Sequence, residues 1–202
     1  MSKETTRKML QLSMQQLLRE IRFSAITVDD ICHHAGVSRK TFYRYYPDRH
    51  ALLSAVYNDC YFSFIEVSAE DSFWDVFRKI CKQISTDKPF FRHAFEVKGQ
   101  NGFWNEAKEI LTPLYMKEAP SYEFLNDIKL FFVTSDLYRL FYLIEQWLAS
   151  GTDQSAEDFA EYIQVSYYIY GLWNSQLASG EARSEFSPEV YSNFKEYIQS
   201  HK

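Results

Sequence analysis

Apolar residues recur at helical intervals near the start of the chain. They fall at i, i+4, i+7 and i+11 and are Leu10, Met14, Leu17 and Ile21. A helix would place all of them on one face. We therefore expect a helix over about residues 3–22, with this apolar face buried.

A second, short helix is expected between Thr27 and Gly36. Thr27 is a good N-cap residue, and Asp30, three positions later, makes a weak capping box with it. Gly36 suits the left-handed conformation that commonly ends a helix. The apolar stripe of this helix consists of Val28, Ile31, Cys32 and Ala35.

Two more helices follow after a very short link. Ser38 can cap a third helix of about seven residues, which ends by Tyr46 because the residue before a proline disfavours the helical conformation. Asp48 can cap a fourth helix, whose apolar side consists of Leu52, Leu53, Val56 and Cys60. The short link between the second and third helices predicts a helix-turn-helix.

The remainder of the chain also has a helical pattern. The expected helices cover residues 71–85, 89–97, 102–117, 123–149, 155–178 and 188–200. Two of them, 123–149 and 155–178, are apolar over more than one face, so each must be buried on two sides. One side would face the core of its own chain, and we expect the other to face a second copy in a homodimer. The expected interface residues are Phe141, Ile144, Trp147, Ile163, Tyr168 and Leu172.

Composition supports a helical protein. The 202 residues include only 6 Gly and 5 Pro, and both residue types disfavour helices. Cys32, Cys60 and Cys81 are far apart and form no CxxC pair, so we expect reduced, buried thiols. The N-terminal residues lack a signal-peptide pattern, and no apolar run approaches the ~18 residues of a membrane span. We expect a cytoplasmic protein that does not interact with a membrane.

The charge of the chain is unevenly distributed. The net charge is −5, which by itself argues against nucleic-acid binding. Residues 1–50, however, contain nine Lys or Arg and five Asp or Glu, a net charge of +4. Residues 51–202 contain thirteen Lys or Arg and twenty-two Asp or Glu, a net charge of −9. A basic N-terminal part is where a polyanion would bind.

The third helix carries side chains suited to the DNA major groove. Such a helix needs polar residues at its N-terminal end, an apolar anchor beneath it and neighbours that bind phosphate. The polar end comprises Ser38, Arg39, Lys40 and Thr41, the anchor is Phe42, and the phosphate-binding neighbours are Tyr43, Arg44, Tyr45, Arg49 and Thr27. We expect Arg39 and Lys40 to contact base edges, with arginine bidentate to guanine O6 and N7.

The segment "TVDDICHHAGVSRKTFYRYYPDRHALLSAVY" (27–57) resembles the DNA-binding signature of the TetR family of bacterial transcriptional regulators. The matching residues are Thr27, Ile31, Ala35, Gly36, Val37, Ser38, Thr41, Phe42, Tyr43, Leu52 and Leu53. Three positions depart from the pattern but keep size or charge. Cys32 stands where alanine is usual, Tyr46 where phenylalanine is usual, and Arg49 where lysine is usual. A weaker similarity, "IEQWLASGTDQSAEDFAEYI" (144–163), resembles the junction of the last two bundle helices, where the family dimerises.

This resemblance implies an all-α protein with two domains. Residues 1–50 would form the helix-turn-helix DNA-binding domain, and residues 51–202 a helical bundle for ligand binding and dimerisation. The protein would be a homodimeric regulator, repressor rather than activator, that binds a near-palindromic operator in double-stranded DNA and needs no cofactor. By position, Thr27, Thr41, Tyr43, Tyr45 and Arg49 would hold the DNA backbone.

The resemblance also implies that the middle helices can enclose an inducer. Aromatic walls suit a hydrophobic or aromatic small molecule. The candidate wall residues are Phe73, Trp74, Phe77, Phe95, Phe103, Trp104 and Tyr138. The alternative is a co-regulator or activator that keeps the fold and binds a partner protein instead of being controlled by an inducer.

No motif supports an enzyme. The sequence has no phosphate-binding glycine loop, GxSxG elbow or HExxH motif. His93 and Glu96 are spaced like half of a metal site, but no second pair supports them, so we expect no metal.

Overall fold

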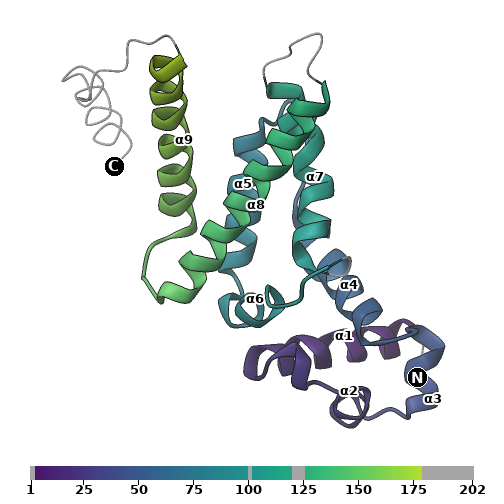
Figure 1. Ribbon diagram of the computed structural model, residues 1–202. Helices are drawn as coiled ribbons and strands as arrows, with labels where there is room; N and C mark the ends of the chain where they lie inside the picture. Colours follow the sequence, from purple (N-terminus) through teal and green to yellow (C-terminus); the bar gives the residue numbers. More distant parts are fainter. Residues whose placement is uncertain (1–2, 100–101, 120–125, 179–202) are drawn as a thin grey trace. The chain divides into compact units, whose positions relative to one another are not determined.

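The computed structural model describes residues 3–99, 102–119 and 126–178, and this part of the chain is helical without strands (Figure 1). The all-α class is therefore confirmed. The helix expected over 188–200 lies outside the described residues. The elements are α1 (Lys3–Glu20), η1 (Phe23–Ala25), α2 (Val28–Ala35), α3 (Arg39–Tyr45), α4 (Arg49–Cys60), η2 (Phe62–Phe64), α5 (Phe73–Ser85), α6 (Lys88–Ala94), α7 (Phe103–Glu118), α8 (Asn126–Ser150) and α9 (Ala156–Ala178).

Helix α1 is the packing centre of the N-terminal part and contacts α2, α4 and α6. Its fully buried apolar residues are Leu10, Met14 and Leu18. The expected stripe was wrong at its C-terminal end, where Ile21 is 40% exposed. Ile21 lies one residue beyond the end of α1 at Glu20, although its amide still donates to the Leu17 carbonyl (2.9 Å).

The body of the protein has an aromatic core. Helix α7 packs against α5 and α8, and α6 packs against α1 and α8 (Figure 1). The Trp104 ring centroid lies 4.1 Å from that of Phe95 and 4.3 Å from that of Phe141, so three elements meet at one indole. Burial raises the pKa of the Cys81 thiol in α5, as expected for a core thiol.

The chain forms two compact units, residues 1–161 and 162–202, and the division falls within α9. The first unit contains α1–α8 with both the helix-turn-helix and the aromatic core. Across residues 3–99, 102–119 and 126–178, no helix combines the length and the apolar character that crossing a membrane requires.

Candidate nucleic-acid interface

The N-terminus of α2 is fixed by a complete capping box. The Thr27 hydroxyl accepts a hydrogen bond from the Asp30 amide (3.2 Å), and the Asp30 carboxylate accepts one from the Thr27 amide (2.8 Å). The hydroxyl also donates to this carboxylate (2.6 Å), and these bonds lower the pKa of Asp30. Thr27, predicted to hold phosphate, thus already uses its single hydroxyl proton within the protein.

The turn between α2 and α3 depends on a glycine. Gly36 adopts φ 64° and ψ 33°, the left-handed conformation that side chains disfavour. After this turn, the Ser38 hydroxyl accepts a hydrogen bond from the Thr41 amide (3.1 Å) and so caps α3. The turn and the cap together fix where α3 begins relative to α2.

Helix α3 has one buried and one outward face. Phe42 is fully buried, and its ring centroid lies 5.3 Å from that of Tyr43, in a T-shaped arrangement, and 6.2 Å from that of Tyr46. The exposed residues on the opposite face are Arg39, Lys40, Tyr43 and Arg44. Thr41 and Tyr45 are half-buried beside them. The fold therefore brings the predicted base-contacting and phosphate-binding residues of α3 together on one short surface.

The two candidate base readers differ in their surroundings. Arg39 forms an ion pair with Asp29 of α2 (2.7 Å), and its guanidinium lies 5.9 Å from the Tyr43 ring centroid. Lys40 has no ion-pair partner within the described part of the chain. One base reader is therefore held in place by the protein, whereas the other extends into solvent. The sequence does not reveal Asp29, because it lies ten positions from Arg39 and across a turn.

Arg49 faces the protein rather than the solvent. Its guanidinium donates to the main-chain carbonyls of Phe23 (2.9 Å) and Ile26, and lies 4.6 Å from the Phe23 ring centroid. These contacts connect the start of α4 to the segment that leads into α2. The guanidinium of Arg49, predicted to bind phosphate, therefore holds the start of α4 against residues 23–26.

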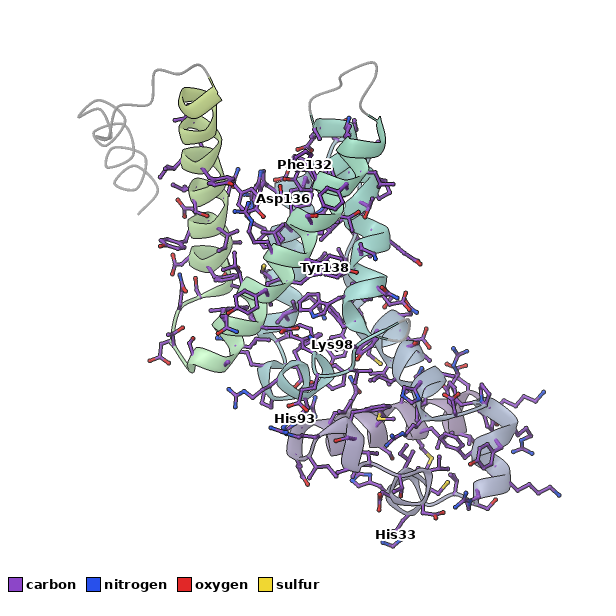
Figure 2. The ribbon with its side chains drawn as sticks, viewed as in Figure 1. His33, His93, Lys98, Phe132, Asp136 and Tyr138 are labelled. Atoms are coloured by element: carbon purple, nitrogen blue, oxygen red, sulfur yellow. The ribbon has the colours of Figure 1, made fainter. Side chains whose placement is uncertain are left out.

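The expected pocket residues mostly pack on one another. Phe73, Phe77, Phe95 and Phe103 are buried, with ring centroids 6.2 Å apart for Phe73 and Phe77 and 5.1 Å apart for Phe95 and Phe103. Tyr138 is instead exposed on α8 (Figure 2), with the Lys108 ammonium 5.5 Å from its ring centroid. Trp74 lies beside Phe73, with centroids 5.1 Å apart.

Cavities occur at other places in the described chain. One of about 480 Å³ lies between α1 and α4 and is lined by polar residues such as Arg7, Gln11 and Asp59. Another of about 300 Å³ lies between α6 and α8, and Phe95 is the predicted pocket residue that lines it.

The predicted interface residues of α8 belong to the core of their own unit. Phe141, Ile144 and Trp147 are buried, and the Trp147 ring stacks on Phe159 with centroids 4.7 Å apart. Ile163, Tyr168 and Leu172 lie on the part of α9 that belongs to the second unit. The large exposed side chains of α8 are instead Leu130, Phe131, Phe132, Tyr138 and Tyr142. Positions 131, 138 and 142 share a side of the helix, so they form the second apolar face expected from the spacing; the structure shows that this face is the exposed one.

Helix α6 connects the helix-turn-helix to the body. The Asp87 carboxylate, just before α6, accepts hydrogen bonds from the Arg19 guanidinium (2.7 Å) and the Tyr61 hydroxyl (2.8 Å). His93, which lies beside α1 in Figure 2, donates from Nδ1 to the Leu18 carbonyl (2.7 Å). Its potential metal-site partner Glu96 lies 3.4 Å from Arg22. These residues therefore join α1 and the end of α4, at Tyr61, to α6 and the residue before it, which sequence spacing did not predict.

Two family models match the chain. One, described as bacterial regulatory proteins of the tetR family, matches residues 13–56, and the other, described as a transcriptional regulator C-terminal region, matches residues 71–167. The HTH-type transcriptional regulator EthR of Mycolicibacterium smegmatis is 49% identical over 39 residues, which are 19% of this chain. The match spans 18% of the length of that relative.

Solved structures resemble the chain over most of its length. A TetR transcriptional regulator from Streptococcus agalactiae has a TM-score of 0.63 at 21% identity, covering 79% of this chain and 91% of that chain. The dihydroxyacetone kinase operon activator DhaS has a TM-score of 0.54 at 15% identity, covering 82% of this chain and 95% of that chain. The likeness to both structures is one of fold.

Proposed function

The chain belongs to the TetR family of bacterial transcriptional regulators, and we propose that it is a homodimeric repressor that acts in the cytoplasm and binds a near-palindromic operator. The observation that carries this proposal is the outward face of α3, where Arg39, Lys40, Tyr43 and Arg44 surround a buried Phe42 anchor. The +4 net charge of residues 1–50 concentrates the attraction for phosphate around this helix.

In this proposal α3 enters the major groove. Arg39 and Lys40 contact base edges, because they occupy the first turn of the helix on its exposed face. The hydroxyl and cationic groups beside them bind phosphates and fix the register on the duplex; these residues are Ser38, Thr41, Tyr43, Arg44 and Tyr45. Two copies would read half-sites about 34–36 Å apart in the simplest arrangement.

The second copy would dock on the exposed side of α8. Phe131, Tyr138 and Tyr142 are 69%, 58% and 58% exposed along one side of this helix. Exposed aromatic residues that share one side of a helix favour an interaction surface. The α9 residues Ile163, Tyr168 and Leu172 stay a separate prediction from the sequence.

Repression would end when an inducer binds the body. Such a ligand acts if it binds more tightly to the conformation in which the two α3 helices are wrongly spaced for DNA. Helix α6 is suited to transmit the change, because it is bonded to α1 and packs on α8. The protein would function by binding, without catalysis or a cofactor.

A second candidate function is activation through a partner protein. It is favoured by the packing of the expected pocket rings, since Phe73 and Phe77, and Phe95 and Phe103, fill space that an inducer would need. The exposed aromatic residues of α8 would then contact a different protein, and one structure of similar fold is named an operon activator.

Selection of bound sequences from a random duplex pool tests the proposal directly. The expected winner is near-palindromic and binds with nanomolar affinity that falls steeply with salt. Replacing Lys40 with Ala should relax the preference at one position of each half-site, by about 1–3 kcal/mol. Weak binding without a sequence preference would refute operator recognition and favour the partner-protein function.

A further inference from the structure

We propose that Asp29 is a positioning residue that holds Arg39 for base recognition and thereby sets part of the specificity of α3. The inference rests on the proposed function, because it concerns how α3 distinguishes sequences. It assigns a role to a carboxylate on α2 that makes no predicted DNA contact.

The Arg39 side chain is held at three points. Nη1 donates to Asp29 Oδ2 (2.7 Å), Nη2 lies 3.5 Å from the Tyr43 hydroxyl, and the guanidinium lies 5.9 Å from the Tyr43 ring centroid. Asp29 is near the start of α2 and Arg39 is the first residue of α3, so the pair bridges the two helices of the helix-turn-helix. An otherwise flexible side chain therefore has a defined direction before DNA arrives.

The pair has little to do with the stability of the fold. The side chains of Arg39 and Asp29 are 57% and 65% exposed, and exposed ion pairs contribute little because water and salt screen them. A carboxylate beside a DNA-binding surface also repels phosphate, which weakens binding to every sequence. The benefit that remains is order: an arginine held in its binding geometry loses less conformational freedom when it binds.

The donor geometry leaves Arg39 able to read a base. A guanidinium has five N–H donors, and the carboxylate engages Nη1. Donors on the other nitrogens remain for the O6 and N7 acceptors of guanine, which bind arginine in a bidentate manner. Asp29 and guanine can therefore bind the same guanidinium at the same time.

The test is a double-mutant cycle on the full-length protein, using the operator obtained by selection. Affinities of wild type, Asp29→Ala, Arg39→Ala and the double variant are measured on the operator, on every single-base-pair substitution of it and on a non-specific duplex. Arg39→Ala should lose about 5- to 150-fold discrimination at one base pair per half-site. Asp29→Ala should lose roughly 2- to 10-fold at the same base pair, without weakening non-specific binding.

The decisive comparison is the effect of Asp29→Ala when Arg39 is absent. If Asp29 acts by positioning Arg39, Asp29→Ala should cause no further loss of discrimination once Arg39 is replaced by Ala. Asp29→Glu keeps a carboxylate and should therefore keep the discrimination of the wild type. Glu20→Gln, which removes an exposed negative charge from the end of α1, serves as the charge control and should change affinity for all sequences alike. Circular dichroism melting should be unchanged in Asp29→Ala.

Two results would overturn the inference. Discrimination could be unchanged in Asp29→Ala, whether or not its affinity for the operator rises, or the loss of discrimination could persist in the Arg39→Ala background. In each case a wild type that still selects an operator leaves the proposed function standing. A wild type that selects no sequence refutes the proposed function and the inference together.

Discussion

Replacing Arg49 with Ala should destabilise the helix-turn-helix without removing a phosphate contact. Sequence reasoning placed this residue among the phosphate-binding groups, where its loss would reduce the salt dependence of DNA binding. In the structure its guanidinium donates to the carbonyls of Phe23 and Ile26 and lies over the Phe23 ring. These bonds hold the segment from which α2 starts, so their loss should loosen the scaffold on which α3 depends.

The expected size of the effect follows from these contacts. A hydrogen bond from a charged donor contributes about 1.5–3 kcal/mol when buried, and the half-buried position of Arg49 reduces this. The contact with the Phe23 ring adds roughly 0.5–1 kcal/mol. We expect Arg49→Ala to lower the free energy of unfolding by about 2–3 kcal/mol, a large part of the 5–15 kcal/mol typical of a protein.

Urea unfolding followed by far-ultraviolet circular dichroism measures this change. Tryptophan fluorescence would not serve, because all four tryptophans lie beyond residue 70 and report on the body. Arg49→Lys is the matched control, since it keeps the charge but cannot offer several carbonyls a planar set of donors. It should lose part of the stability and leave the salt slope of DNA binding unchanged.

The reasoning would be refuted by the opposite pattern. If Arg49→Ala unfolds like wild type and its salt slope falls by about one, the guanidinium binds phosphate in the complex. If, in addition, Arg49→Lys binds DNA as tightly as the wild type, the positive charge at position 49 contributes to DNA binding and the hydrogen bonds to the carbonyls do not.

Asp87→Ala should lower the free energy of unfolding, measured in urea, by about 2–4 kcal/mol, because the Arg19 guanidinium and the Tyr61 hydroxyl lose a nearly buried carboxylate. As a control, Glu96→Gln removes a more exposed ion pair and should lower it by less than about 0.5 kcal/mol. Hydrogen bonds from the N-cap Ser72 lower the pKa of Asp75 to about 2, so the stability that the Asp75 carboxylate contributes is complete above about pH 4 and is lost as the pH falls towards 2. Asp75→Asn should make the free energy of unfolding depend less on pH between about 4 and 2, and an unchanged pH profile would contradict this. Tyr142→Glu should give folded monomers in light scattering, whereas Phe141→Glu should unfold the protomer; a dimeric Tyr142 variant would show that the interface lies elsewhere.

The elements of the DNA-binding part could be predicted from sequence because their signals are local. A cap such as Thr27 or Ser38 binds an amide three residues away, and Gly36 ends α2 through its own dihedral angles. The outward face of α3 follows equally from spacing, since one buried residue, Phe42, fixes the direction of its neighbours. The order of helices, the turn and the candidate reading residues were therefore determined by the sequence alone.

The tertiary structure decided which partners these side chains have. Arg49 bonds to carbonyls more than twenty positions earlier, and Arg39 pairs with Asp29 across the turn. Spacing showed that α8 is apolar on two sides, but not that Phe141 packs inward on Trp104 while its neighbour Tyr142 faces outward. Short-range backbone preferences fix helices and caps, whereas burial and pairing depend on residues that only folding brings together.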